Sequence, residues 1–294
     1  MGTISIIAKN LFCFTAFLFI GSCSQDQIDI GENVTLDCVH QNASGAIPSN
    51  LYEAGAIIQT DEYPPFTKKL SVCGITLVAR DDVSDVFMLR VGKTIGEMFS
   101  IHEETDTLKQ QKLLKNLYTY QTVIPLFFGE DWSFHPNEES DWEELNNRYS
   151  ICDIIMEEVP NPVMEVVEHI LHHFTDIDNW GLTNASRLFN LTKEAIELGY
   201  YNVNQYEEIN EAGIRNRVIL QEYAYWIIYT SWNLRNSHGP DHSEWSIFTS
   251  SELENKLKSS YQLVQETVPS ILSCLLYTSP SPRDAHESRM PSSA

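Results

Sequence analysis

The spacing of apolar and polar residues predicts a chain of helices interrupted by two short strands. Residues 74–80 and 122–128 are β-branched apolar runs, which are typical of buried strands. Pro125 favours a sheet edge or a bulge for the second strand, because proline lacks the N–H that a central strand donates. We therefore expect an α+β, mostly helical fold with a small sheet. Its helices are predicted at residues 84–98, 107–120, 164–176, 184–198, 218–234 and 251–272.

Two segments lack a clear period. Residues 24–69 contain Pro, Gly and Ser clusters, and we expect them to form an N-terminal arm that leads into one domain at residues 70–273. The acidic residues 129–148, which carry Trp132 and Trp142, are expected to form an exposed loop.

The first 23 residues have the order of a secretory signal. One lysine precedes an apolar run at residues 11–20 that is too short to span a bilayer, and small residues follow it. The alternative is a lipobox at residues 20–23, which would leave the mature chain lipid-anchored at Cys23. We expect a secreted glycoprotein without a transmembrane span, because four N-glycosylation sequons follow the signal. They begin at Asn33, Asn42, Asn184 and Asn190.

Residues 274–294 change abruptly to a Ser-, Pro- and Arg-containing composition without apolar periodicity. Such a segment cannot bury a core, so we expect it to be a disordered tail. It also resembles translated adaptor sequence, and no function is inferred from it.

Charge and cysteines narrow the range of functions. The formal net charge of −22 disfavours binding to nucleic acid or anionic lipid. Three cysteines lie away from the chain ends, too scattered for a zinc cluster: Cys38, Cys73 and Cys152. A bond between Cys73 and Cys152 is favoured because both adjoin core-like segments, although the sequence leaves the pairing open.

The predicted helix at residues 164–176 carries the most distinctive chemistry. Its apolar residues fall on one side, and two glutamates, two histidines and an aspartate form a stripe on the other. Carboxylates and imidazoles on one anchored face are the donors of a divalent-metal site. The stripe consists of Glu165, Glu168, His169, His172 and Asp176.

A second acidic position stands out in residues 218–234, where Glu222 is the only charged residue of an otherwise apolar run. A helix of this composition must be buried nearly all round. A carboxylate inside it is costly unless it is paired, protonated or bound to metal. We therefore predict that this helix packs beside the one at residues 164–176.

The pattern of the stripe and Glu222 resembles the metal site of secreted zincin metallopeptidases of the gluzincin type. That family places H-E-x-x-H on one helix and a glutamate ligand on a later helix, and its zinc-bound water hydrolyses peptide bonds. Here residues 168–172 read Glu-His-Ile-Leu-His, with the first two letters exchanged, and Glu222 lies in Glu-Tyr-Ala-Tyr-Trp. The resemblance covers residues 75–232. It implies a zincin-like fold, a Zn²⁺ ion and a peptide or protein substrate.

The exchanged motif leaves several ligand sets open, each with Glu222 as a ligand. If Glu168 and His172 bind the ion, His169 stands at the position of the general base. If His169 and His173 bind it, an isoleucine replaces the catalytic glutamate and hydrolysis should be crippled. A mixed set of His169, His172 and Glu222 with a glutamate nearby also remains.

Two alternatives need no catalysis. A stripe of glutamate and histidine is often a solvated helix face held by i, i+4 pairs. The chain would then be an inactive extracellular binding protein on a zincin-like scaffold. Metal content and peptidase activity distinguish these readings.

Overall fold

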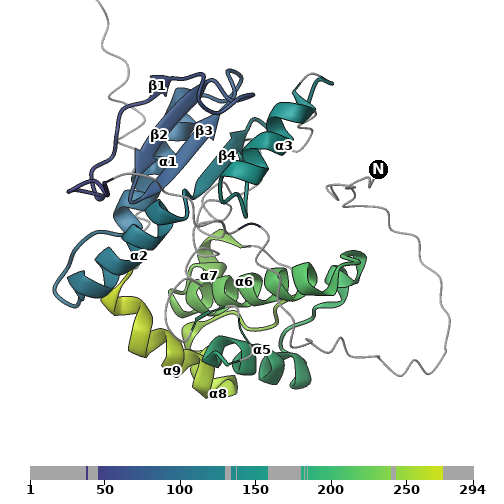
Figure 1. The fold of residues 1–294 in the computed structure, drawn as a ribbon. Helices are drawn as coiled ribbons and strands as arrows, with labels where there is room; N and C mark the ends of the chain where they lie inside the picture. The colour runs from purple at the N-terminus through teal and green to yellow at the C-terminus, as the bar shows by residue number, and fades with distance from the viewer. Residues whose placement is uncertain are drawn as a thin grey trace, which may run out of the picture.

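A computed structural model provides the fold. It describes residues 38, 46–129, 134–136, 138–157, 180–181, 183, 185–239 and 243–273. Four sequence predictions lie outside these residues: the signal at 1–23, Trp132, the helix at 164–176 and the tail at 274–294. The described elements form a sheet with its covering helices and, beside it, a layer of helices from the C-terminal half (Figure 1).

The sheet is mixed, which supports the α+β prediction. Its first three strands pair antiparallel, and the third to fifth strands pair parallel. The spatial order follows the chain order: β1 (Ile58–Gln59), β2 (Lys68–Val72), β3 (Ile75–Ala79), β4 (Val123–Phe127) and β5 (Ile155–Met156). The two parallel connections each contain helices, as parallel pairing requires. Strands β3 and β4 were predicted, whereas β1 and β2 were not.

The hairpin between β2 and β3 turns on two residues. Cys73 and Gly74 have φ angles of 51° and 77°, the left-handed values of a primed two-residue turn. A Cβ atom at Gly74 would lie 2.4 Å from the backbone oxygen of Leu114. Only glycine fits here, because the turn presses against the second helix.

Pro125 is tolerated in β4 because its nitrogen faces β5, which is only two residues long. The N–H of Val123 donates to Ser150, and the C=O of Phe127 accepts from Glu157, so alternate residues of β4 face β5. β5 pairs only with the last two residues of β4. The predicted edge position is wrong, because β4 pairs with both β3 and β5, and the proline is tolerated because the ladder to β5 needs no bond from residue 125.

Two predicted helices connect β3 to β4: α1 (Asp85–Met98) and α2 (Thr107–Thr119). Side-chain caps fix where they begin. The Ser84 side chain accepts from Phe87 N–H at 3.1 Å, and Asp106 accepts from Leu108 and Lys109 N–H. Their apolar sides pack into the larger hydrophobic core on one face of the sheet.

The predicted loop at residues 129–148 is wrong at its end, because α3 (Glu139–Arg148) is a helix. It buries Trp142 and Leu145 in a second core with Phe66 and Phe127. The ring centroids of Trp142 lie 6.0 Å from Phe66 and 6.3 Å from Phe127, in edge-on geometry. This aromatic cluster covers the sheet face opposite α1 and α2, and a tryptophan that looked like a loop residue anchors it.

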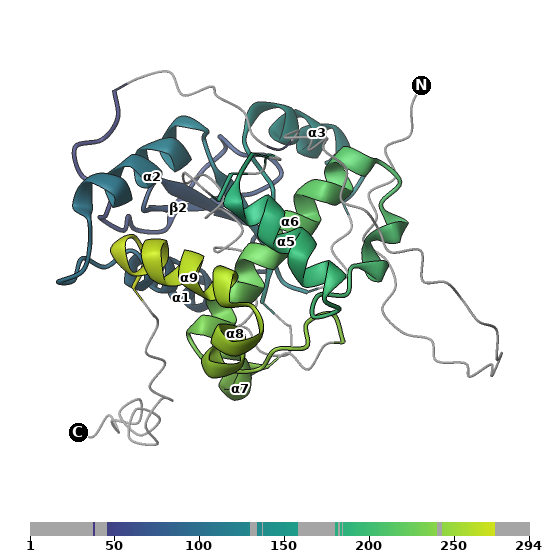
Figure 2. The same cartoon turned by 90° about the horizontal axis from the view of Figure 1, so that it is seen from below.

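The C-terminal half forms the helical layer (Figures 1 and 2). Its helix α6 contacts α5, α8 and α9, and its residues 219–230 are buried except for Glu222. The prediction of a helix buried nearly all round is confirmed. The predicted final helix is instead broken at Leu257. The elements are α5 (Arg187–Glu197), η2 (Asn204–Glu208), α6 (Ala212–Ser231), α7 (Arg235–His238), α8 (Ser250–Lys256), α9 (Lys258–Thr267) and η3 (Val268–Ser270).

None of the helices in the described ranges has the length and apolar content needed to cross a bilayer.

The favoured cysteine pairing is wrong. Cys38 and Cys152 form the disulfide, with Cα atoms 5.1 Å apart, and Cys73 is a free thiol. Cys73 is 1% exposed because the hairpin turn places it in the larger core. Burial raises the pKa of its thiol to about 12, which leaves it protonated.

Candidate functional site

Glu222 lies near the middle of α6 and is half-buried, whereas the residues that follow it up to Thr230 are buried. Sequence reasoning singled it out as an acid inside an apolar helix. The structure supplies a second carboxylate beside it, Glu244, from the segment between α7 and α8. These two side chains are the centre of the candidate site.

Glu244 is held in place through both its backbone and its side chain. Its backbone C=O accepts from Asn202 N–H at 2.7 Å, and the next residue, Trp245, forms an antiparallel bridge with Tyr201. Its carboxylate Oε1 accepts from the Tyr206 hydroxyl at 2.5 Å. The residue is only 6% exposed. A buried carboxyl group with fixed partners therefore faces the acidic position of α6.

Two bonds fasten this segment to α6 itself. The Tyr201 hydroxyl donates to the Ile219 C=O at 3.0 Å, and the Trp245 indole N–H donates to Thr230 Oγ1 at 2.9 Å. They lie on either side of Glu222 along the helix. The separation of the two carboxylates is thus set by rigid elements rather than by a loose loop.

Aromatic rings surround the pair. Tyr201 lies 5.5 Å from Tyr223, and Trp226 stacks on Trp245 at 6.3 Å, measured between ring centroids. Their burial replaces water by apolar surface, which strengthens every electrostatic interaction at the site.

The electrostatics follow from this burial. Loss of hydration and, to a smaller extent, the charge of Glu222 together raise the pKa of Glu244 to about 7. The hydrogen bond from Tyr206 acts in the opposite direction but is weaker. Burial and the same acidic charges hold the pKa of Tyr206 well above 10, so its hydroxyl remains a donor.

Such a pair has a limited set of chemical uses. Burial and a neighbouring negative charge favour the protonated form of Glu244, or a cation bound beside it. Near neutral pH, Glu244 exchanges its proton readily, which is the property of a general acid or base. Among the residues that the structure describes, no cluster of three or more His, Cys, Asp or Glu side chains could hold a metal ion.

The predicted site residues divide into two groups. The structure describes Glu222, which lies on the predicted helix. The other predicted site residues lie outside the described part of the chain: Glu168, His169, His172 and His173. The tyrosines at 223, 225 and 229, on the same helix as Glu222, are buried core residues.

Sequence reasoning missed Glu244, because it lies in a segment without periodicity and is one of many acidic residues. Its only signal is the Trp245 that follows it. A buried aromatic next to an acid marks a segment that packs into the core.

Comparison with known proteins gave no match: no protein family, no curated protein and no solved structure showed significant similarity to the chain. The function therefore has to be argued from the residues of the site.

Proposed function

We propose that the chain is a secreted zincin-like protein that binds Zn²⁺ through Glu222 and imidazoles of residues 164–176, and that hydrolyses peptide bonds. The supporting observation is the pair formed by half-buried Glu222 and buried Glu244, in which Glu244 has a pKa of about 7. The predicted ligands His169, His172 and His173 and the carboxylate of Glu222 are donor types that zinc takes in proteins.

Glu244 has a specific role in this proposal. In the ligand set of His169, His173 and Glu222, an isoleucine occupies the position of the family's general base. Glu244 supplies a carboxylate from a different element, with a pKa suited to proton transfer near neutral pH. Tyr206 orients it by donating to Oε1. Bound zinc would polarise the substrate carbonyl and acidify a water molecule.

Zinc binding is tested on the full chain after dialysis against a chelator. Added Zn²⁺ should raise the melting temperature of the wild type, because metal that binds only the folded state stabilises it. Glu222→Gln should remove most of this rise. Glu208→Gln is the matched control, because it makes the same change on an exposed residue of η2. A wild-type melting temperature unaffected by zinc would refute the metal site.

Two further variants separate the ligand sets. His169→Ala should release the metal if His169 is a ligand. It should leave binding intact and abolish turnover if His169 is the base. Glu244→Gln should retain zinc and lose peptidase activity if Glu244 is the base.

The second candidate function is an extracellular binding protein without hydrolysis. The observation that favours it is the missing H-E-x-x-H motif at residues 168–173. A protein that binds zinc stoichiometrically and cleaves none of a mixture of unfolded protein substrates would fit this function and not the peptidase.

A further inference from the structure

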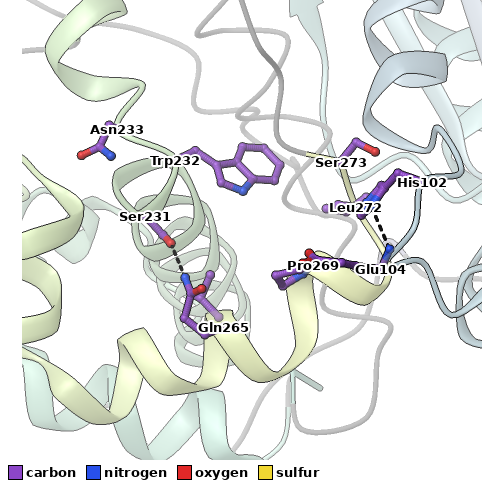
Figure 3. Close-up of a pocket in the computed structure, with 10 residues that line it drawn as sticks. His102, Glu104, Ser231, Trp232, Asn233, Gln265, Pro269, Leu272 and Ser273 are labelled. Atoms are coloured by element: carbon purple, nitrogen blue, oxygen red, sulfur yellow. Dashed lines mark hydrogen bonds between the residues drawn. The ribbon is translucent and has the colours of Figure 1, made fainter.

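A cavity of about 550 Å³ opens at the C-terminal end of α6, about 13 Å along the helix axis from Glu222. This volume is in the range of small-molecule sites. Figure 3 shows its residues, which come from α6, from α9 and η3, and from the segment between α1 and α2. It is lined by His102, Glu104, Ser231, Trp232, Asn233, Val264, Gln265, Pro269, Leu272 and Ser273.

Three helix C-termini converge around this cavity: those of α1, α6 and α9. The Ser273 N–H donates to the C=O of Met98, the last residue of α1, at 2.8 Å. Gln265 of α9 donates to the hydroxyl of Ser231, the last residue of α6, at 3.1 Å. These bonds hold the three ends around a common space.

The helix ends give the cavity a negative potential. The C-terminus of a helix carries partial negative charge from its last carbonyl groups. A basic side chain in the last turn commonly offsets this charge, and none of these three helices has one. The electrostatic contributions of the three ends therefore add.

The side chains reinforce this sign. Glu104 is the one acidic side chain among the described lining residues, and neither lysine nor arginine is present there. His102 Nδ1 accepts from Glu104 N–H at 3.3 Å. An anion would meet no lysine or arginine, whereas a cation would meet a carboxylate.

Trp232 adds a binding surface for such a cation. It is the cap residue of α6 and is half-buried, and Figure 3 shows its indole at the cavity. An indole face attracts ammonium groups more strongly than other aromatic rings do. Its apolar surface also suits the methylene groups that carry an ammonium.

We propose that this cavity binds an aliphatic primary ammonium group, carried either by a free alkylamine or by a lysine side chain. The ammonium is held by Glu104 and by the face of the Trp232 indole, in the negative potential of the helix ends, and its alkyl chain packs on the apolar edge of the same indole. The site is separate from the Glu222 and Glu244 pair and does not depend on zinc.

The test uses the full chain in a chelator-containing buffer, so that failure of the metal site does not affect it. Calorimetric titration with butylammonium and with N-acetyl-lysine amide should show binding. Butanol should bind more weakly, and butyrate should not bind. The tighter of the two cations identifies the free amine or the lysine side chain as the ligand type. Butyrate binding equal to that of butylammonium, or no binding of either cation, would overturn the proposal.

Variants locate the site. Trp232→Leu should weaken butylammonium binding about fivefold to thirtyfold through the lost cation–π contact. Glu104→Gln should weaken it about twofold to fivefold, because Glu104 is exposed and screened. Glu103→Gln is the matched control, since this exposed neighbour does not line the cavity. If Trp232→Leu fails to fold, the comparison of Glu104→Gln with Glu103→Gln decides, and equal affinities there would refute the site.

Discussion

Replacing Glu244 by glutamine should stabilise the metal-free protein, and the gain should grow as pH rises from about 4.5 to about 7. The variant keeps a carbonyl oxygen that can accept from Tyr206 and removes the group whose ionisation burial opposes. Burial and Glu222 raise the pKa of Glu244 from an ordinary value of 4.5 to about 7. With about 1.4 kcal/mol for each pKa unit, the ionised carboxylate costs about 3 kcal/mol of folding stability.

The pH dependence has a definite sign. Below about pH 4.5 the carboxyl is protonated in the folded and the unfolded chain, so it adds no penalty. Between this pH and about pH 7 the unfolded chain has released its proton and the folded chain has not. The stability of the wild type therefore falls as pH rises through this window, and the full penalty applies above it.

Urea unfolding followed by tryptophan fluorescence measures the effect in a chelator-containing buffer. Near pH 8, Glu244→Gln should be more stable than the wild type by about 3 kcal/mol, and near pH 5 by less than about 1 kcal/mol. Glu208→Gln, on an exposed residue, should show no such dependence. Glu222→Gln should shift the window to lower pH, because it removes one of the charges that raise the pKa of Glu244. A Glu244→Gln difference that is equal at both pH values would refute the reasoning.

Three further predictions concern the fold. Gly74→Ala should cost about 2 kcal/mol or more in urea unfolding, because φ is +77° and the new Cβ would lie 2.4 Å from the Leu114 oxygen. Gly96→Ala, at a helical site with open space, should instead gain about 0.5–1 kcal/mol, and equal effects would refute the argument. Loss of the Cys38–Cys152 bond in the double serine variant should cost about 2–4 kcal/mol. Peptide mapping after thiol alkylation should find Cys73 unmodified until the chain unfolds, and rapid labelling of the folded protein would contradict its burial.

Local signals predicted the elements whose boundaries are set by their own residues. The cap Ser84 and the left-handed Gly199 mark helix ends without reference to the rest of the chain. The apolar run of α6 likewise requires burial on every side. For these elements the sequence pattern and the tertiary environment require the same structure.

Other elements depend on partners that are distant in the chain. In β2, Lys68 looks solvated, yet it is 5% exposed because its ammonium binds the Val83 C=O and Asp85. The acidic composition of α3 hid the spacing of Trp142 and Leu145, which face the sheet. A strand or helix is hard to recognise from the sequence when its polar residues are paired with residues of another element.

The site was predictable in part for the same reason. Glu222 was found from its own helix. Glu244 becomes significant only because its neighbour Trp245 bridges to Tyr201 and donates to Thr230 of α6. Tyr201 in turn donates to the Ile219 C=O of the same helix. The disulfide is a similar case, because it joins positions 114 residues apart. No local pattern encodes such a pairing.

The burial of α6 also determines how natural variation in this protein should be interpreted. In homologous chains, most positions at residues 219–230 of this helix will be restricted to apolar or aromatic residues, since they are buried in the core. Sequence conservation along it will therefore be high and will lack the three-to-four-residue period of a surface helix. A conserved tryptophan or tyrosine there will reflect packing. Gln221, Glu222 and Thr230 are the polar positions among residues 219–230, and whether position 222 stays acidic in homologues will distinguish selection for a function from selection for a stable core.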